Sequence, residues 1–166
     1  MDRLLYLLET NPRLTNEELA VMLGVSEDEV REQIRIYEES GVIKGYRAIL
    51  DKEKVNARDC TALIEIKVQP KFGHGFDEVA QRIANLEEVE SIYLMSGGYD
   101  LCCIVQNKSF EEVAMFVVKR LSPLEDVVST TTNFILKKYK EQGISFAEQT
   151  KDDRGTISLW LTITNF

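Results

Sequence analysis

The first fifty residues carry apolar side chains at the three- and four-residue spacing of amphipathic helices. The clearest case is the stripe formed by Val30, Ile34 and Tyr37, which would lie on the buried face of one helix. Shorter apolar patterns precede it at residues 2–9 and 19–23. The pattern therefore predicts three helices, close enough in sequence to pack together.

Two of the three predicted helices begin with a capping box, in which Ser or Thr is followed three residues later by Glu. Thr15 with Glu18 is the first, and Ser26 with Glu29 is the second. Gly24 lies between them, where a tight turn needs a residue without a Cβ atom. Two short helices joined by such a turn indicate a helix-turn-helix, whose second helix can enter a DNA major groove. The alternative is a helical hairpin that only packs.

A wing is predicted directly after this motif. The second helix of the helix-turn-helix, which begins after Ser26, should end at Gly41. Residues 42–50, Val-Ile-Lys-Gly-Tyr-Arg-Ala-Ile-Leu, have the pattern of a β-hairpin. Residues 1–50 would then form a winged helix-turn-helix DNA-binding domain. Residues 51–59 are charged and poor in large apolar side chains, so we interpret them as a linker.

From residue 60 the apolar period becomes that of alternating strands. The pattern predicts strands at 60–68, 89–95, 101–105 and 127–136, with amphipathic helices at 76–86 and 110–121. The order βαββαβ is that of a ferredoxin-like sandwich, in which both helices cover one face of an antiparallel sheet. The other face would expose Leu63, or its neighbours of alternate phase, and an exposed apolar face favours dimerisation. The predicted fold class is therefore α+β.

The C-terminal residues extend beyond this pattern. Residues 141–146 are suited to a further short strand, which would end a domain spanning residues 60–146. In the extension at 147–166, apolar and other residues alternate again. The alternation predicts an extra strand, paired within the protomer or with a partner; a disordered tail is the alternative. The apolar positions are Ile157, Leu159, Leu161 and Ile163.

Composition indicates a globular cytoplasmic protein. The chain has 166 residues, of which 44% are hydrophobic and 29% charged, and no run is long and apolar enough to cross a membrane. No secretory signal is recognised at its start. Cys60, Cys102 and Cys103 lack C-x-x-C spacing, which favours reduced thiols, and His74 is the one histidine. We expect no metal and no cofactor.

The charge distribution bears on DNA binding. The net charge is −8, and residues 1–55 hold 12 acidic and 8 basic side chains. Non-specific DNA affinity comes from Lys and Arg side chains that neutralise phosphates. We therefore expect DNA affinity to be low and sensitive to salt.

Three motifs together identify a family. They are Leu19-Ala20 with Gly24-Val25-Ser26, Gly-Val-Ile-Lys-Gly-Tyr at 41–46, and Ser-Gly-Gly-Tyr-Asp at 96–100. In this combination the chain resembles the leucine-responsive and asparagine-responsive (Lrp/AsnC, or feast/famine) regulators over about residues 1–146. The resemblance implies a transcriptional regulator and not an enzyme. It also implies dimers built from the C-terminal sheets, often four of them in a ring as an octamer, and an amino-acid-like effector bound between dimers near residues 97–100.

The turn at 97–100 has chemistry that suits a free amino acid. Backbone N–H groups of Gly97 and Gly98 can bind a carboxylate, and Asp100 can receive an amino group. Tyr99 could cover the ligand, and hydroxyls of the fourth strand could add contacts. The alternative is a glycine turn in which Asp100 bonds its own backbone. The expected effector-binding residues are Gly97, Gly98, Tyr99, Asp100, Thr130 and Thr132.

Basic residues of the second helix and the wing are the candidates for contact with DNA. Gln33 could read adenine if it faces the groove, and wing cations would hold phosphates. The related helices usually carry a run of Arg and Lys, whereas this one has Glu32, Gln33 and Ile36 at such places. Glu32 can fold back on a neighbouring Arg, and acids on the outward stripe would repel phosphates. The expected DNA-binding residues are Arg31, Gln33, Arg35, Lys44 and Arg47.

Two other functions compete with a DNA-binding regulator that responds to an amino-acid-like effector. The chain could be a regulator-like protein that has lost DNA binding and acts in assembly or partner contact, since its second helix is acidic. It could also be an enzyme, because sirohaem decarboxylases share this two-domain architecture. A tetrapyrrole site would need several His and Arg residues, and the chain has one His.

Overall fold

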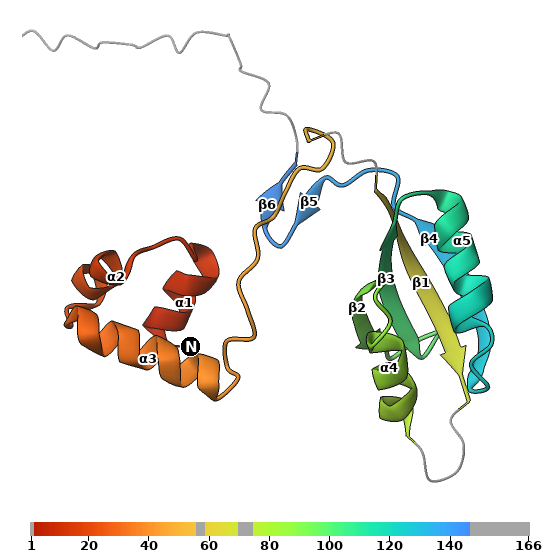
Figure 1. The fold of residues 1–166 in the computed structure, drawn as a ribbon, viewed down its shortest axis with the longest axis horizontal. Coiled ribbons are helices and arrows are strands. Elements are labelled where there is room, and N and C mark those ends of the chain that lie inside the picture. The colour runs from red at the N-terminus through yellow and green to blue at the C-terminus, as the bar shows by residue number, and fades with distance from the viewer. Residues whose placement is uncertain (1, 56–58, 70–74, 147–166) are drawn as a thin grey trace, which may run out of the picture. The chain divides into compact units, whose positions relative to one another are not determined.

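The computed structural model describes residues 2–55, 59–69 and 75–146 (Figure 1). The chain divides into two compact units, residues 1–50 and residues 51–166. Within the described ranges, no helix combines the length and the hydropathy that crossing a bilayer requires. The strand predicted in the extension at 147–166 lies outside the described residues, as do His74 and residues 56–58.

The N-terminal unit is a bundle of three helices, as the sequence predicted. They are α1 (Arg3–Thr10), α2 (Asn16–Leu23) and α3 (Glu27–Glu39). Their shared core contains Leu4, Leu19 and Val30, with Leu19 completely buried and Val30 at 1% exposure. Ile34 and Tyr37 pack against this core, so the apolar stripe of α3 faces inward.

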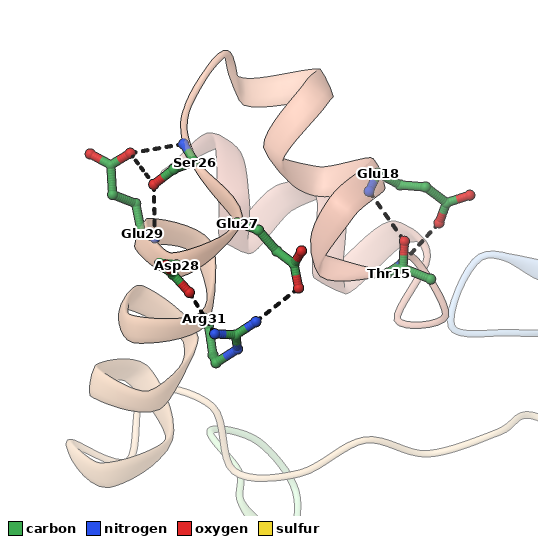
Figure 2. Close-up of polar contacts among 7 residues, drawn as sticks. All are labelled: Thr15, Glu18, Ser26, Glu27, Asp28, Glu29 and Arg31. Atoms are coloured by element: carbon green, nitrogen blue, oxygen red, sulfur yellow. Dashed lines mark hydrogen bonds and ion pairs between the residues drawn. The ribbon is translucent and has the colours of Figure 1, made fainter.

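Both predicted capping boxes form and fix where α2 and α3 begin (Figure 2). Glu18 N donates to Thr15 Oγ1 at 3.1 Å, and Thr15 N donates to Glu18 Oε2 at 2.8 Å. Ser26 and Glu29 bond in the same way. Gly24 closes α2 with a φ of 71°, a left-handed conformation that costs glycine little because it has no Cβ.

The structure corrects the hairpin expected at residues 42–50, which contain no strand. Gly41 has a φ of 71°, and Ile43 N donates to Tyr37 O at 3.0 Å. Residues 42 and 43 thus complete the C-terminal cap of α3 instead of starting a strand. Only residues 44–50 then remain for the two strands and the turn of a hairpin.

The second unit has the predicted βαββαβ order (Figure 1). Its sheet is antiparallel, with strand order β2-β3-β1-β4. One π-helical turn at Val117–Leu121 follows α5, and a small hairpin of β5 (Lys140–Glu141) and β6 (Ile144–Ser145) replaces the single strand expected at 141–146. The other elements are β1 (Cys60–Val68), α4 (Phe76–Ala84), β2 (Val89–Leu94), β3 (Leu101–Asn107), α5 (Phe110–Phe116) and β4 (Val127–Phe134).

One face of the sheet is covered by both helices. Ile64 and Ile66 of β1 are completely buried in a core that includes Ile83 of α4 and Val113 of α5. Residues of alternate phase on β1 therefore lie on the opposite face, which we call the open face. It carries Leu63, Glu65 and Lys67 of β1 together with their cross-strand partners.

Candidate DNA interface and effector site

Arg31 is the first of two arginines that α3 presents to solvent. Its guanidinium donates to Asp28 Oδ1 at 2.6 Å and to Glu27 Oε1 at 2.9 Å (Figure 2). These partners lie three and four residues earlier, on the same side of the helix. Arg31 is thus neutralised by carboxylates of its own helix.

Arg35 is held still more closely by the next pair of acids. Its Nε and one terminal nitrogen donate to the two oxygens of Glu32 at 2.9 and 2.6 Å, and the other terminal nitrogen donates to Glu39. The hydrogen bonds that Arg35 donates to Glu32 and then to Glu39 raise the pKa of Arg35, and the bond accepted from Arg35 lowers the pKa of Glu32. The sequence left open which arginine Glu32 would reach, and the structure pairs it with Arg35.

This arrangement sets the electrostatics of the outward face of α3. Four carboxylates surround two guanidinium groups, so the face keeps an excess of negative charge. Because all six side chains are exposed, the ion pairs contribute little to folding stability. They matter for binding instead, since a phosphate must replace a carboxylate at each arginine.

Gln33 does not lie on the outward face. Its side chain is half-buried and bonds the Tyr37 hydroxyl, which donates to Asp2 Oδ2 at 2.6 Å. The Asp2 bond is the main reason that the pKa of Tyr37 is raised, and it lowers the pKa of Asp2 in turn. Gln33 therefore faces α1 across a cavity of about 580 Å³. The structure gives no support to Gln33 as a base-reading residue.

The two cations expected in the wing lie on the segment after α3. Lys44 and Arg47 are both exposed. The Lys44 ammonium lies against Gly41, where an added Cβ would meet Nζ at 2.8 Å. This is the C-terminal end of α3, where the helix dipole favours a cation. Tyr46 ties the segment to the same helix, because its hydroxyl donates to Glu38 Oε1 at 3.1 Å.

The candidate effector turn joins β2 to β3, and Asp100 anchors it. Asp100 Oδ2 accepts a hydrogen bond from Val68 N at 2.9 Å, and Asp100 N donates to Ile66 O at 3.1 Å. Met95 N donates to Asp100 O at 2.8 Å and closes the turn. One carboxylate oxygen of Asp100 is therefore committed to the end of β1, at the irregularity between Lys67 and Val68.

The glycines of this turn leave its surface open. A Cβ atom added to Gly97 or Gly98 would meet no atom within 4 Å, and neither glycine has a positive φ. Neither position therefore demands glycine for backbone or packing reasons. What the glycines provide is backbone that no side chain covers, beside the half-buried Tyr99.

Thr130 and Thr132 are not brought together with this turn. They pair with Ile66 and Ile64 across β1 and β4, so they lie half-buried on the helix-covered face. β1 separates them from β3, which places their strand about 10 Å from β3. The register of β4 with β1 determines which face each threonine occupies. The run of hydroxyl residues in the sequence does not predict that register.

Two family models match the chain. Residues 61–144 match the Lrp/AsnC ligand binding domain, and residues 3–44 match a winged helix-turn-helix DNA-binding domain. The first range includes the whole candidate effector turn. The second includes α1 to α3 and ends at Lys44.

Curated relatives are similar over most of the chain. An uncharacterized HTH-type transcriptional regulator of Bacillus subtilis, YugG, is 47% identical over 93% of this chain and 94% of its own length. An uncharacterized HTH-type regulator of Pyrococcus furiosus is 31% identical over 85% of this chain and 92% of its own. These relatives confirm the expectation of a regulator and not an enzyme.

Solved structures share the fold. The leucine response regulatory protein LrpA of Mycobacterium tuberculosis superposes with a TM-score of 0.71, at 27% identity, over 86% of this chain and 97% of that one. A transcriptional regulator of Neisseria meningitidis, solved as a complex with L-Met, superposes with a TM-score of 0.68 at 24% identity, over 85% and 93%. This chain belongs to the Lrp/AsnC family of DNA-binding transcriptional regulators.

Proposed function

We propose that the chain is a cytoplasmic homodimer that recognises operator DNA through α3 and responds to a free amino acid bound at the turn formed by residues 97–100. The observation that carries the DNA part is the placement of Arg31 and Arg35. Both guanidinium groups lie on the solvent side of α3, opposite the core-facing Val30. Lys44 and Arg47 add cations just beyond the end of this helix. The three free cysteines suit a reducing compartment.

The amino-acid part rests on the chemistry of the turn. Exposed backbone at Gly97 and Gly98 is accessible to a carboxylate, and Asp100 has a second oxygen beyond the one bonded to Val68 N. A free amino acid carries one charge of each sign a few ångströms apart, which matches these two groups. The L-Met complex of the Neisseria regulator supports the same class of ligand.

The dimer part rests on the open face. Leu63 and Ile104 are half-buried there, and Tyr93 is 54% exposed. Leu63 pairs with Ile104, and Tyr93 pairs with Cys102 on the same strand as Ile104, so these residues lie on one surface with apolar parts. A second copy of the sheet would bury this surface, and further association of dimers would build a larger ring.

A second function is favoured by one specific observation. Each exposed arginine of α3 is already paired with two carboxylates, and the face keeps excess negative charge. Such a helix also suits contact with a protein partner in a regulator that has lost DNA binding. Sequence-specific DNA reading remains our proposal, because more than half of each arginine side chain is exposed and both lie on the solvent side of α3.

Binding of the full-length protein to a fluorescent fragment of its own promoter tests the proposal. Anisotropy titrations at low salt should show binding that Arg35→Ala abolishes and that mixed amino acids change. Arg13→Ala removes another exposed arginine, from the loop after α1, and should leave binding unchanged. Absence of binding by the wild type at low salt would favour the protein-partner function.

A further inference from the structure

The open face carries a carboxylate near its middle. Glu65 lies at the centre of β1, an inner strand of the sheet, and pairs with Cys102 on one side and Thr131 on the other. Its side chain is half-buried in the single chain, and Asn133 Nδ2 donates to Glu65 Oε1 at 3.2 Å. The neighbouring Cys102 is buried. A second protein surface packed here would remove Glu65 from water.

A carboxylate buried in this way needs a cation. Burial of a charge without an opposite charge is strongly unfavourable, because the lost hydration of the charge is not replaced. The amide of Asn133 supplies one hydrogen bond but no charge. Within the described residues Glu65 forms no ion pair, so its charge is uncompensated in the single chain and a partner surface can supply the cation.

The same face holds a matching cation. Lys67 is the only Lys or Arg in the four strands of the sheet. It lies two positions after Glu65, about 7 Å further along the same face. Its side chain is exposed and forms no ion pair with any described residue. The open face thus presents one negative and one positive charge, side by side along β1.

We propose that Glu65 of each protomer pairs with Lys67 of the partner subunit, across a two-fold axis that crosses β1 near Ile66. The inference rests on the dimer proposed above and specifies its register. In a two-fold interface, each contact occurs twice with the two protomers exchanged. Glu65 of one protomer therefore pairs with Lys67 of the other, and the same axis generates the reciprocal pair. An axis at Glu65 would oppose two carboxylates, and an axis at Lys67 would oppose two ammonium groups. Charge complementarity therefore selects a second copy of this chain as the occupant of the face.

Charge reversal in the full-length protein tests the pair by sedimentation. Glu65→Lys and Lys67→Glu should each weaken dimerisation at least about tenfold, because coupling between close interfacial charges begins near 1.5 kcal/mol. The variant that carries both reversals should dimerise within about threefold of the wild type. Mixing the two single variants should give a heterodimer, since their faces are then complementary. Glu87→Lys, an exposed reversal between α4 and β2, should have no effect.

The outcomes separate this inference from the proposed dimer. A wild type that stays monomeric at micromolar concentration would overturn both. A wild-type dimer unaffected by either single reversal would overturn the pair and leave the dimer standing. Weakening by both single reversals without rescue, in the double variant or in the mixture, would also overturn the pair. Circular dichroism of each variant checks folding, and Glu65→Gln provides a milder change if a reversal fails to fold.

Discussion

Val68 N donates to Asp100 Oδ2 at 2.9 Å, across 32 residues of chain, and this bond joins the end of β1 to the turn before β3. The acceptor of this bond is a side chain, whereas the rest of the β1–β3 pairing is made by backbone hydrogen bonds. Asp100 therefore has a structural role in addition to the one proposed in effector binding. Experiments on this residue must separate the two.

Replacement of Asp100 by alanine should lower the stability of the second unit. The change leaves Val68 N without its acceptor, which costs about 1–3 kcal/mol of the free energy of unfolding. Urea unfolding monitored by circular dichroism measures the loss. Asp100→Asn keeps an acceptor oxygen and should recover most of the stability, and equal losses in both variants would contradict this explanation.

Replacement of Gly98 by valine should weaken amino-acid binding without loss of stability. The new Cβ atom meets no neighbour within 4 Å, and the side chain covers backbone that the ligand carboxylate would contact. Loss of one charge-assisted bond corresponds to about ten- to a hundredfold in affinity. Calorimetry against a panel of amino acids measures the change, with Gly45→Val in the other unit as control. Unchanged affinity would place the effector elsewhere.

Replacement of Glu32 by arginine should strengthen non-specific DNA binding. It removes one carboxylate from Arg35 and adds one cation to the outward face of α3. One further phosphate contact should steepen the dependence of log affinity on log salt by about one unit. Anisotropy titrations at four salt concentrations measure the slope, with Glu87→Arg as control. An unchanged slope would mean that this face does not meet DNA.

Stability should fall as the pH rises above about 9. Burial raises the pKa of the Cys103 thiol from 9.0 to about 12. Because the folded pKa is the higher one, this contribution is complete below pH 9 and is lost as the pH rises toward 12. The raised pKa values of Tyr37, Tyr46, Cys60 and Cys102 act in the same direction. Urea midpoints between pH 8 and 11 test this, and Cys103→Ala should show a shallower decline.

Local patterns predicted most of the fold. The capping boxes at Thr15 and Ser26 and the stripe of α3 involve residues within one helix, so sequence spacing specifies them. The βαββαβ order follows from the change of apolar period at residue 60. The hairpin at 42–50 was mispredicted because backbone bonds at the end of α3 use the residues that would have begun it.

The candidate sites were less predictable because they depend on pairing between distant segments. The bond from Tyr37 to Asp2 spans 35 residues, so no pattern within α3 predicts it, whereas the spacing of Gln33 from Val30 and Tyr37 already places it beside the buried stripe. Thr130 and Thr132 fall on the helix-covered face because of the register of β4 with β1. Capping and amphipathic patterns specify no such register.

If α3 contacts DNA as proposed, its ion pairs also affect how the protein distributes itself over a genome. Non-operator DNA offers phosphates but no matching base edges. An arginine that exchanges its two carboxylate partners for a phosphate of such DNA therefore gains little binding free energy. An operator adds base contacts to the same exchange. Chromosomal DNA competes through the number of its sites, and weak binding to each of them leaves more of the protein for the operator. In the proposed interface, the acidic face of α3 thus reduces the fraction of the regulator bound to non-operator DNA.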